Sequence, residues 1–295
     1  MGNYILSCCS MIDLTKKQIE DRDIKVIFGH YSLDEKEYRD DFGETISYKD
    51  FYQAMVDGAD TKTWQINSTE FAEHFEQFVS QGYDVVHLSL SSGLSGTFNS
   101  ASYAAEQVNE KYPDRHVYVI DSLGASSGYG MIIDKMADLR DEGMAAEDLV
   151  KWVEENRLKM RYEFFSTDLT FYIKGGRVSK ASGMVGTLLG ICPLLDVDIY
   201  GKLIPRKKVR TKKKVMTEIV KLMEERAQNG YDYSDKCYIC HSDCLEDAEA
   251  VKALIKEKFP KIKGDVEIYD IGTSIGSHTG PGTAAIFYWG SDRTE

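Results

Sequence analysis

The sequence predicts an α/β fold with two domains. An N-terminal three-layer α/β domain with a parallel sheet is expected at 1–160, and a C-terminal α+β domain with a mixed sheet at 161–295. In the first half, short apolar runs alternate with helix-like runs, which is typical of a parallel sheet covered by helices. From residue 161 onward, strand-like runs follow one another before the next helix, which is typical of an α+β arrangement. A chain of 295 residues, 42% hydrophobic and 28% charged, is long enough for two such cores.

The individual elements follow from apolar periodicity. Short apolar runs expected to be strands lie at 4–10, 23–30, 84–90 and 116–121. Runs with apolar residues at helical spacing lie at 68–82, 97–112, 129–143 and 145–159. In the second half we expect strands at 161–173 and 188–209, a hairpin turn from Asp198 to Gly201, and helices at 212–228 and 245–259. Because no Gly/Ser-rich linker separates the halves, we expect the domains to pack tightly.

The stretch "SLSSGLSGTFNSA" at 89–101 leads from an expected strand into an expected helix. The free N–H groups of the first helical turn and the helix dipole attract an anion at such a turn. Gly93 and Gly96 allow the backbone to approach that anion closely. Hydroxyl donors are available from Ser91, Ser92, Ser95 and Thr97. The stretch therefore predicts an anion-binding loop, although a Ser-Gly turn with an N-cap also occurs without any ligand.

Composition excludes several classes of protein. A net charge of −12 argues against a general nucleic-acid binder, because the phosphate backbone would be repelled. No apolar run approaches the ~18 residues of a membrane span, and the N-terminus lacks the basic leader of a signal peptide. Gly2 does not fit the myristoylation pattern, because Leu6 stands where Ser or Thr is required. We therefore expect a cytoplasmic protein whose six cysteines are reduced thiols.

Two further motifs invite a chemical interpretation. The segment "CYICHSDC" at 237–244 resembles a metal or haem motif, but it lacks a distant second ligand pair and fits a strand that leads into a helix. The segment "GTSIGSHTGPG" at 272–282 lacks the spacing of a nucleotide-binding loop. We expect neither a metal nor a cofactor. A serine hydrolase built on Ser95 stays open as an alternative, although no G-x-S-x-G turn supports it.

One histidine and one basic run stand apart from the rest. His278 lies between Gly276 and Gly280, so we expect a loop to present its ring, either to a ligand or simply at a surface turn. The run "RKKVRTKKK" at 206–214 is an exception in an acidic chain. It indicates either a solvated face or a surface on which a partner docks.

Taken in order, these motifs resemble the DegV family of bacterial fatty-acid-binding proteins, which includes the fatty-acid-presenting subunits of fatty acid kinase. The resemblance covers essentially the whole chain. It is carried by "SSGLSGTFNSA", by "VIDS" at 119–122, "YIKGGRVS" at 172–179, "LLGICPLLDVDIYGKL" at 188–203, "KVRTKKK" at 208–214 and "IGSHTGPG" at 275–282. The resemblance implies a DegV-like pair of domains with a long-chain fatty acid buried between them, its carboxylate held by the anion-binding loop.

The resemblance also assigns roles to particular residues. It implies that the carboxylate-binding residues are Thr63, Ser95, Gly96 and His278. It implies supporting or kinase-facing roles for Arg177, Arg210, Ser92 and Thr97. The sequence departs from the family pattern at Trp64, where a serine is usual, and at Cys9, where an aspartate is usual. Trp64 either narrows the mouth of the site or packs in the core, and we expect the core.

The resemblance thus implies a lipid-binding protein without enzymatic activity of its own, cytoplasmic and monomeric, with at most transient contact with a membrane surface. It would present a long-chain fatty acid to a separate fatty acid kinase, which forms an acyl phosphate for phospholipid metabolism. The alternative is an enzyme that acts alone, either a serine-dependent acyl hydrolase or a protein similar to the dihydroxyacetone kinases.

Overall fold

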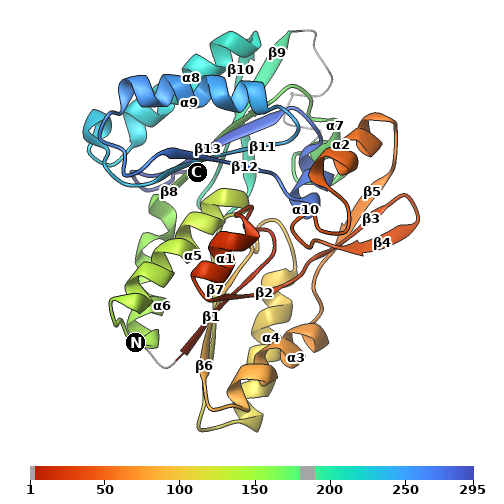
Figure 1. Ribbon diagram of the computed structural model, residues 1–295, viewed down its shortest axis with the longest axis vertical. Coiled ribbons are helices and arrows are strands. Elements are labelled where there is room, and N and C mark those ends of the chain that lie inside the picture. Colours follow the sequence, from red (N-terminus) through yellow and green to blue (C-terminus); the bar gives the residue numbers. More distant parts are fainter. Residues whose placement is uncertain (1–3, 180–189) are drawn as a thin grey trace.

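Three β-sheets organise the chain in the computed structural model, which describes residues 4–179 and 190–295 (Figure 1). The first is a parallel sheet with the strand order β2-β1-β6-β7. Its strands are β1 (Tyr4–Cys9), β2 (Ile24–Ile27), β6 (Asp84–Ser89) and β7 (Val117–Asp121). The predicted parallel sheet is therefore confirmed.

Helices cover both faces of the parallel sheet, because its strands are apolar on both sides. On β1, the side chains of Leu6 and Cys8 join one core cluster and that of Cys9 joins another, as expected from the alternation of a strand. Cys9 packs toward α3 (Ser68–Val79) and α4 (Thr97–Lys111). The opposite face is covered by α1 (Lys16–Asp21), α5 (Ser126–Asp141) and α6 (Ala146–Asn156). This confirms the predicted three layers.

The second sheet is mixed and has the strand order β10-β9-β8-β13-β11-β12. Its neighbouring strands are antiparallel except for the parallel pair β11 and β12. The strands are β8 (Met160–Ser166), β9 (Ile191–Val197), β10 (Leu203–Arg210), β11 (Cys237–His241), β12 (Val266–Asp270) and β13 (Thr283–Trp289). The helices α8 (Lys212–Arg226) and α9 (Leu245–Lys258) cover one face. This confirms the mixed sheet predicted for the second half.

Helix α5 lies between the two large sheets (Figure 1). It contacts β1 of the parallel sheet and β8, β11 and β13 of the mixed sheet. As a result, one continuous hydrophobic core contains side chains from both sheets. Strand β8 begins at Met160, next to the domain boundary proposed from the sequence.

The third sheet is small, antiparallel and absent from the sequence prediction. It has the order β4-β3-β5, with β3 (His30–Leu33), β4 (Lys36–Arg39) and β5 (Thr61–Trp64). The helix α2 (Tyr48–Val56) lies between β4 and β5 in the sequence. The strand predicted at 23–30 is in fact divided: β2 ends at Ile27 and β3 begins at His30. A helix from the far end of the chain, α10 (Thr273–Thr279), packs against this small sheet.

Two other predictions need correction and one is confirmed. The strand predicted at 161–173 ends at Ser166, and the helix α7 (Thr170–Lys174) follows it. His278 does not lie on a loop but in the last turn of α10, which Gly280 ends with a φ of +64°. The hairpin turn is confirmed: Gly201 has a φ of +71° and its N–H donates to the carbonyl of Asp198 over 3.1 Å. Residues 188 and 189, the start of one motif, lie outside the described residues.

The cysteine-rich segment forms a strand that leads into a helix, as predicted. Cys237 and Cys240 are buried in β11, and Cys244 is the N-cap of α9. Short 3₁₀ helices at Arg157–Lys159 and Gly230–Asp232 complete the described elements. Within 4–179 and 190–295, no group of three or more His, Cys, Asp and Glu side chains is arranged to hold a metal ion. None of the helices in that part of the chain is long and apolar enough to cross a membrane.

Candidate functional site

A cavity of about 320 Å³ lies where the three sheets meet. This volume is within the usual range for small-molecule sites. Its wall is formed by β5, by the loop between β6 and α4, by the start of α5, by α10 and by one face of the mixed sheet. The cavity therefore lies at the carboxyl end of β6, where the anion-binding loop was predicted.

The mixed sheet supplies an apolar floor. Tyr162 and Phe164 point from β8 to the same face, since they are two residues apart. Phe287 and Ala285 lie directly opposite them on β13 and also line the cavity. Val197 and Leu203 extend this face onto β9 and β10. Such a surface binds hydrocarbon by burial, at ~0.8 kcal/mol for each methylene removed from water.

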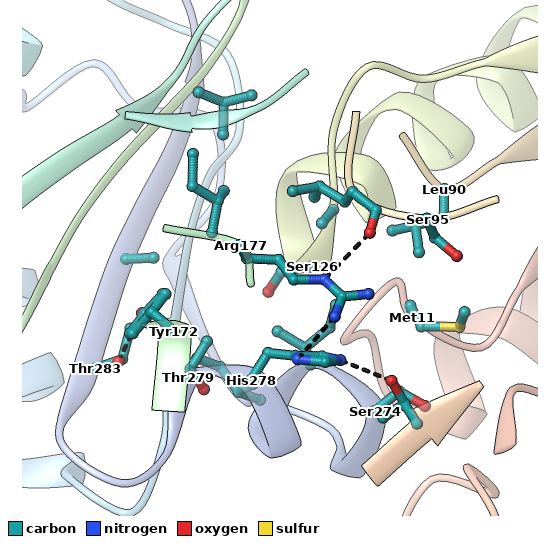
Figure 2. A pocket seen from close by; sticks show the side chains of 18 of the residues that line it. Met11, Leu90, Ser95, Ser126, Tyr172, Arg177, Ser274, His278, Thr279 and Thr283 are labelled. Carbon is teal, nitrogen blue, oxygen red and sulfur yellow. Dashed lines mark hydrogen bonds between the residues drawn. The ribbon is translucent and has the colours of Figure 1, made fainter. Parts of the chain in front are cut away.

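The polar end of the cavity contains Thr63, Ser95, Gly96, Arg177 and His278, which we call the head-group site. The Oγ1 atom of Thr63 lies 2.6 Å from Nε2 of His278. The Nη1 atom of Arg177 lies 3.3 Å from Nδ1 of the same ring, and its Nε donates to the carbonyl of Leu94 over 3.2 Å. Figure 2 shows the guanidinium of Arg177 beside the imidazole of His278.

These contacts fix the positions of the protons. A guanidinium can only donate, so Nδ1 of His278 accepts from Arg177 and its Nε2 carries the hydrogen. That Nε2–H donates to Thr63, whose own hydroxyl hydrogen is left for another acceptor. Burial, together with the charge of Arg177, lowers the pKa of His278 to about 3, so the ring is neutral near pH 7.

The anion-binding loop has the local structure that was predicted. Strand β6 ends at Ser89, and α4 begins at Thr97 with Gly96 as an N-cap that has no side-chain hydrogen bond. The hydroxyl groups of Ser95 and Thr97 lie 2.9 Å apart, and the N–H of Thr97 donates to Ser95 Oγ over 3.3 Å. The first turn of α4 therefore directs N–H groups and a positive dipole end to the same region as Ser95.

Two glycines around this site are in close contact with neighbouring side chains. A Cβ atom on Gly96 would lie 2.1 Å from Oε1 of Gln65. A Cβ atom on Gly175 would lie 2.2 Å from Nδ1 of His278. Both distances are far below van der Waals contact, so these glycines let the loop and the histidine pack closely.

The structure brings five of the eight predicted site residues together and separates three from the cavity. The five form the head-group site. Thr97 is fully buried behind Ser95. Ser92 is exposed, and its N–H donates to Oδ1 of Asp121 over 3.2 Å. Arg210 is exposed at the end of β10, an edge strand. These three do not line the cavity.

Trp64 is the clearest error of the sequence analysis at the site. It was expected in the core, but it is 40% exposed and lines the cavity. Its indole stacks on the ring of His30, with centroids 5.8 Å apart and planes 2° apart, because the two residues are paired across β5 and β3. His30 Nε2 in turn lies 2.6 Å from Oε1 of Glu70. The sequence analysis did not identify His30 as a residue of the cavity wall, because only the pairing of β3 with β5 brings it next to Trp64.

The chain is similar to known proteins over nearly its whole length. The model of a family described as "Uncharacterised protein, DegV family" matches residues 10–290. A DegV domain-containing protein of Clostridium perfringens is 36% identical over 293 residues, which cover 99% of each chain. A Thermus thermophilus structure described as fatty acid binding of a DegV family protein has a TM-score of 0.84 and 26% identity, and covers 98% of this chain and 100% of its own.

A fatty acid binding protein of Bacillus subtilis, also solved, has a TM-score of 0.83 and 28% identity, with 99% of this chain and 100% of that chain covered. The likeness therefore extends over both large sheets. A sequence match and a shared fold that both run nearly from end to end mean that this chain belongs to the DegV family.

Proposed function

We propose that the protein binds a long-chain fatty acid, with the carboxylate in the head-group site and the acyl chain on the apolar floor of the cavity. One observation carries the proposal: hydrogen-bond donors converge at one end of a cavity whose remaining wall is mainly apolar. The relatives from Thermus thermophilus and Bacillus subtilis, which are described as binding fatty acids, support it.

The head-group site suits an anion in particular. The hydroxyl hydrogen of Thr63 is not used by His278, and Ser95 stands at the uncapped start of α4. Arg177 supplies positive charge, although burial lowers its pKa from the usual value. Hydrogen bonds from such donors to a carboxylate are charge-assisted and stronger than those to a neutral group.

A matched pair of ligands tests this proposal. Delipidated protein is titrated with stearic acid and with stearyl alcohol, which have the same chain but differ in charge. We expect the acid to bind more tightly by at least about tenfold, because only the acid offers an anion to the head-group donors. Equal binding of the two, or no binding of the acid, would contradict the proposal.

We further infer that the bound fatty acid is presented to a separate kinase, in the cytoplasm and by a monomeric protein, so that its carboxylate becomes an acyl phosphate. The sequence contains no recognisable nucleotide-binding loop of its own. The exposed cations Arg210, Lys213 and Lys214 form a concentrated positive surface on an acidic protein, and such a surface can steer an acidic partner.

The kinase step is tested with a fatty acid kinase catalytic subunit, ATP and a saturating fatty acid. The variant Arg210→Ala should lower acyl phosphate formation at physiological salt, whereas Lys17→Ala, an exposed cation on α1, should not. Equal rates for the two variants would contradict a docking role for the basic run.

Among the described residues, no hydroxyl group of the cavity lies beside a histidine nitrogen that is free to accept its proton, because Nε2 of His278 carries a hydrogen and its Nδ1 accepts from Arg177. Ser95 hydrogen-bonds to Thr97, and His278 hydrogen-bonds to Thr63 and Arg177. Ser7 does hydrogen-bond to two histidines, but it is fully buried and does not line the cavity. We therefore favour binding and presentation over hydrolysis.

A further inference from the structure

The anion-binding loop is anchored on a serine that does not itself face the cavity. Ser91 is fully buried and does not line the cavity. Its backbone carbonyl accepts the N–H groups of Leu94 and Ser95 over 3.1 Å and 3.2 Å. Its Oγ atom accepts the N–H of Gly93 over 3.1 Å. The backbone that carries Ser95 of the head-group site is therefore held by hydrogen bonds to Ser91.

The hydroxyl group of Ser91 also connects this loop to the mixed sheet. It donates to the carbonyl of Gly201 over 2.9 Å, at the tip of the hairpin between β9 and β10. The two backbones approach closely here, because a Cβ atom on Gly93 would lie 2.4 Å from the carbonyl oxygen of Tyr200. A Cβ atom on Gly201 would lie 2.0 Å from Oγ of Ser91. The hairpin tip therefore lies directly against the anion-binding loop.

The hairpin tip has a fixed conformation and a fixed place. Oδ1 of Asp198 accepts the N–H groups of Tyr200 and Lys202 over 2.9 Å and 2.8 Å, which closes the turn. Nη1 of the buried Arg293 donates to the carbonyls of Asp198 and Leu123 over 2.9 Å and 2.8 Å. Leu123 belongs to the loop after β7, so the tip is bound to the loops that follow both β6 and β7.

The same hairpin contributes to the apolar floor. Val197 and Leu203 are paired next to the turn, and both line the cavity. One element of the mixed sheet thus contacts the cavity with its side chains and holds the anion-binding loop of the parallel sheet with its backbone.

We propose that Ser91 is a positioning residue: by fixing the anion-binding loop on the β9–β10 hairpin, it makes the head-group site selective for a carboxylate. This inference rests on the proposed function. Donors that are already aligned lose little freedom when an anion binds, whereas a loose loop has to be ordered at that moment. A carboxylate depends on this alignment more than an alcohol does, because its charge-assisted hydrogen bonds are the stronger ones.

The test measures the binding of stearic acid and of stearyl alcohol to delipidated variants. We expect Ser91→Ala to reduce the preference for the acid from at least about tenfold to below about threefold, mainly by weakening the binding of the acid. Ser7→Ala is the matched control, because Ser7 is also fully buried, its hydroxyl group also has two hydrogen-bond partners, and it does not line the cavity. Ser7→Ala should lose stability and keep the preference, and thermal unfolding verifies that each variant is folded.

A second pair of variants reaches the same contact from the mixed sheet. Asp198→Ala removes the acceptor of two N–H groups in the turn and should also lower the preference for the acid, although Asp198 does not line the cavity. Asp198→Asn keeps an acceptor oxygen at this position and should retain the wild-type preference. The pair separates the geometry of the turn from its charge, and it decides the question if Ser91→Ala does not fold.

Three results would overturn the inference while leaving the proposed function intact. One is a folded Ser91→Ala variant with the wild-type preference, which would mean that the loop does not need the hairpin. Another is a Ser7→Ala variant that loses the preference equally, because the effect would then follow from lost stability. The third is an equal preference in Asp198→Ala and Asp198→Asn. A wild type that binds the acid no more tightly than the alcohol would overturn the proposed function itself, and this inference with it.

Discussion

Two clusters in this protein contain the same chemical groups but have different surroundings. In the head-group site, His278 hydrogen-bonds to the hydroxyl group of Thr63 at the wall of the cavity. In the core, Ser7 of β1 lies 2.8 Å from Nε2 of His74 and 2.9 Å from Nδ1 of His87. Burial lowers the histidine pKa in both, to about 3 for His278 and to about 4 for His74.

The two clusters differ in whether a hydroxyl group keeps a hydrogen that no protein group accepts. In the core cluster, the hydroxyl group of Ser7 donates to one histidine and accepts from the other, so both its functions are used within the protein. In the head-group site, Arg177 fills the acceptor atom of His278 and thereby makes the ring a donor to Thr63. The hydrogen of Thr63 is then available to a ligand. We infer that a histidine beside a hydroxyl group becomes a binding site only where such a donor faces a cavity.

The largest expected effect comes from removing the free donors. Thr63→Val and Ser95→Ala should each weaken fatty-acid binding by about 1.5 to 3 kcal/mol, the usual value for a hydrogen bond to a charged group. This corresponds to roughly ten- to hundredfold in Kd. Titration of delipidated protein measures the loss, and thermal unfolding shows that the variants are folded. Unchanged affinity in both variants would place the carboxylate elsewhere.

The core cluster should respond in the opposite way. Ser7→Ala leaves ring nitrogens of His74 and His87 buried without partners, so we expect the free energy of unfolding to fall by about 1 to 3 kcal/mol. Fatty-acid affinity should stay within about twofold, since Ser7 does not line the cavity. Urea denaturation and ligand titration separate the two effects. A large loss of affinity with little loss of stability would break the comparison.

Acid should affect the two clusters alike in the ligand-free protein. The pKa of His74 is lowered to about 4 and that of His278 to about 3, so below pH ~6.5 the unfolded chain binds protons that the folded chain does not. Stability contributed by both groups is therefore lost as the pH falls. Burial raises the pKa of Asp13 to about 7, which has the opposite sign in the same window.

Variants isolate the histidine contribution, because Asp13 is common to all of them. Relative to wild type, His74→Gln and His278→Gln should each flatten the dependence of unfolding free energy on pH by up to about 1.4 kcal/mol per pH unit between about pH 6 and 4.5. Denaturation curves across this range give the slopes. A slope identical to that of wild type in either variant would mean that the histidine in question is not held neutral by burial.

The smallest effect is expected for a cation outside both clusters. Arg210 is exposed on the edge strand β10, so Arg210→Ala should change fatty-acid affinity by no more than about twofold. Arg177→Ala removes the partner of His278 and should weaken binding more strongly. Titration of both variants at physiological salt tests the contrast. An equal loss in the two would mean that general charge, and not contact with the imidazole, is what matters.

The sequence predicts the large elements because they have strong local patterns. The run at 84–90 and the Ala-rich run that follows predict β6 and α4, and the glycine at 201 marks the hairpin. The small sheet escapes prediction because its strands are four residues long and β4 carries Lys36, Glu37 and Arg39 without apolar alternation. Its partner, α10, comes from the other end of the chain.

The site could be predicted only in part, because its residues also lack a local sequence pattern that joins them. Thr63 and His278 are separated by 215 residues, and no local pattern joins them, so only the family resemblance indicated that both belong to one site. His278 was placed on a loop because Gly276 and Gly280 flank it. In the structure, Gly276 instead lets α10 pack closely, since a Cβ atom there would lie 2.5 Å from the hydroxyl oxygen of Tyr52. Residues 273–279 are helical because of tertiary packing, which local helix propensity does not predict.

Extraction of the purified protein followed by mass spectrometry tests the central claim most directly. We predict that wild type releases a stoichiometric amount of long-chain fatty acid, and that the double variant Thr63→Val/Ser95→Ala, purified in parallel, releases far less. Such a ligand should also raise the melting temperature of delipidated wild type when it is added back, because it binds only the folded state. Wild type that carries no fatty acid and shows no thermal shift with added fatty acid, or a double variant that retains as much lipid as wild type, would contradict the account.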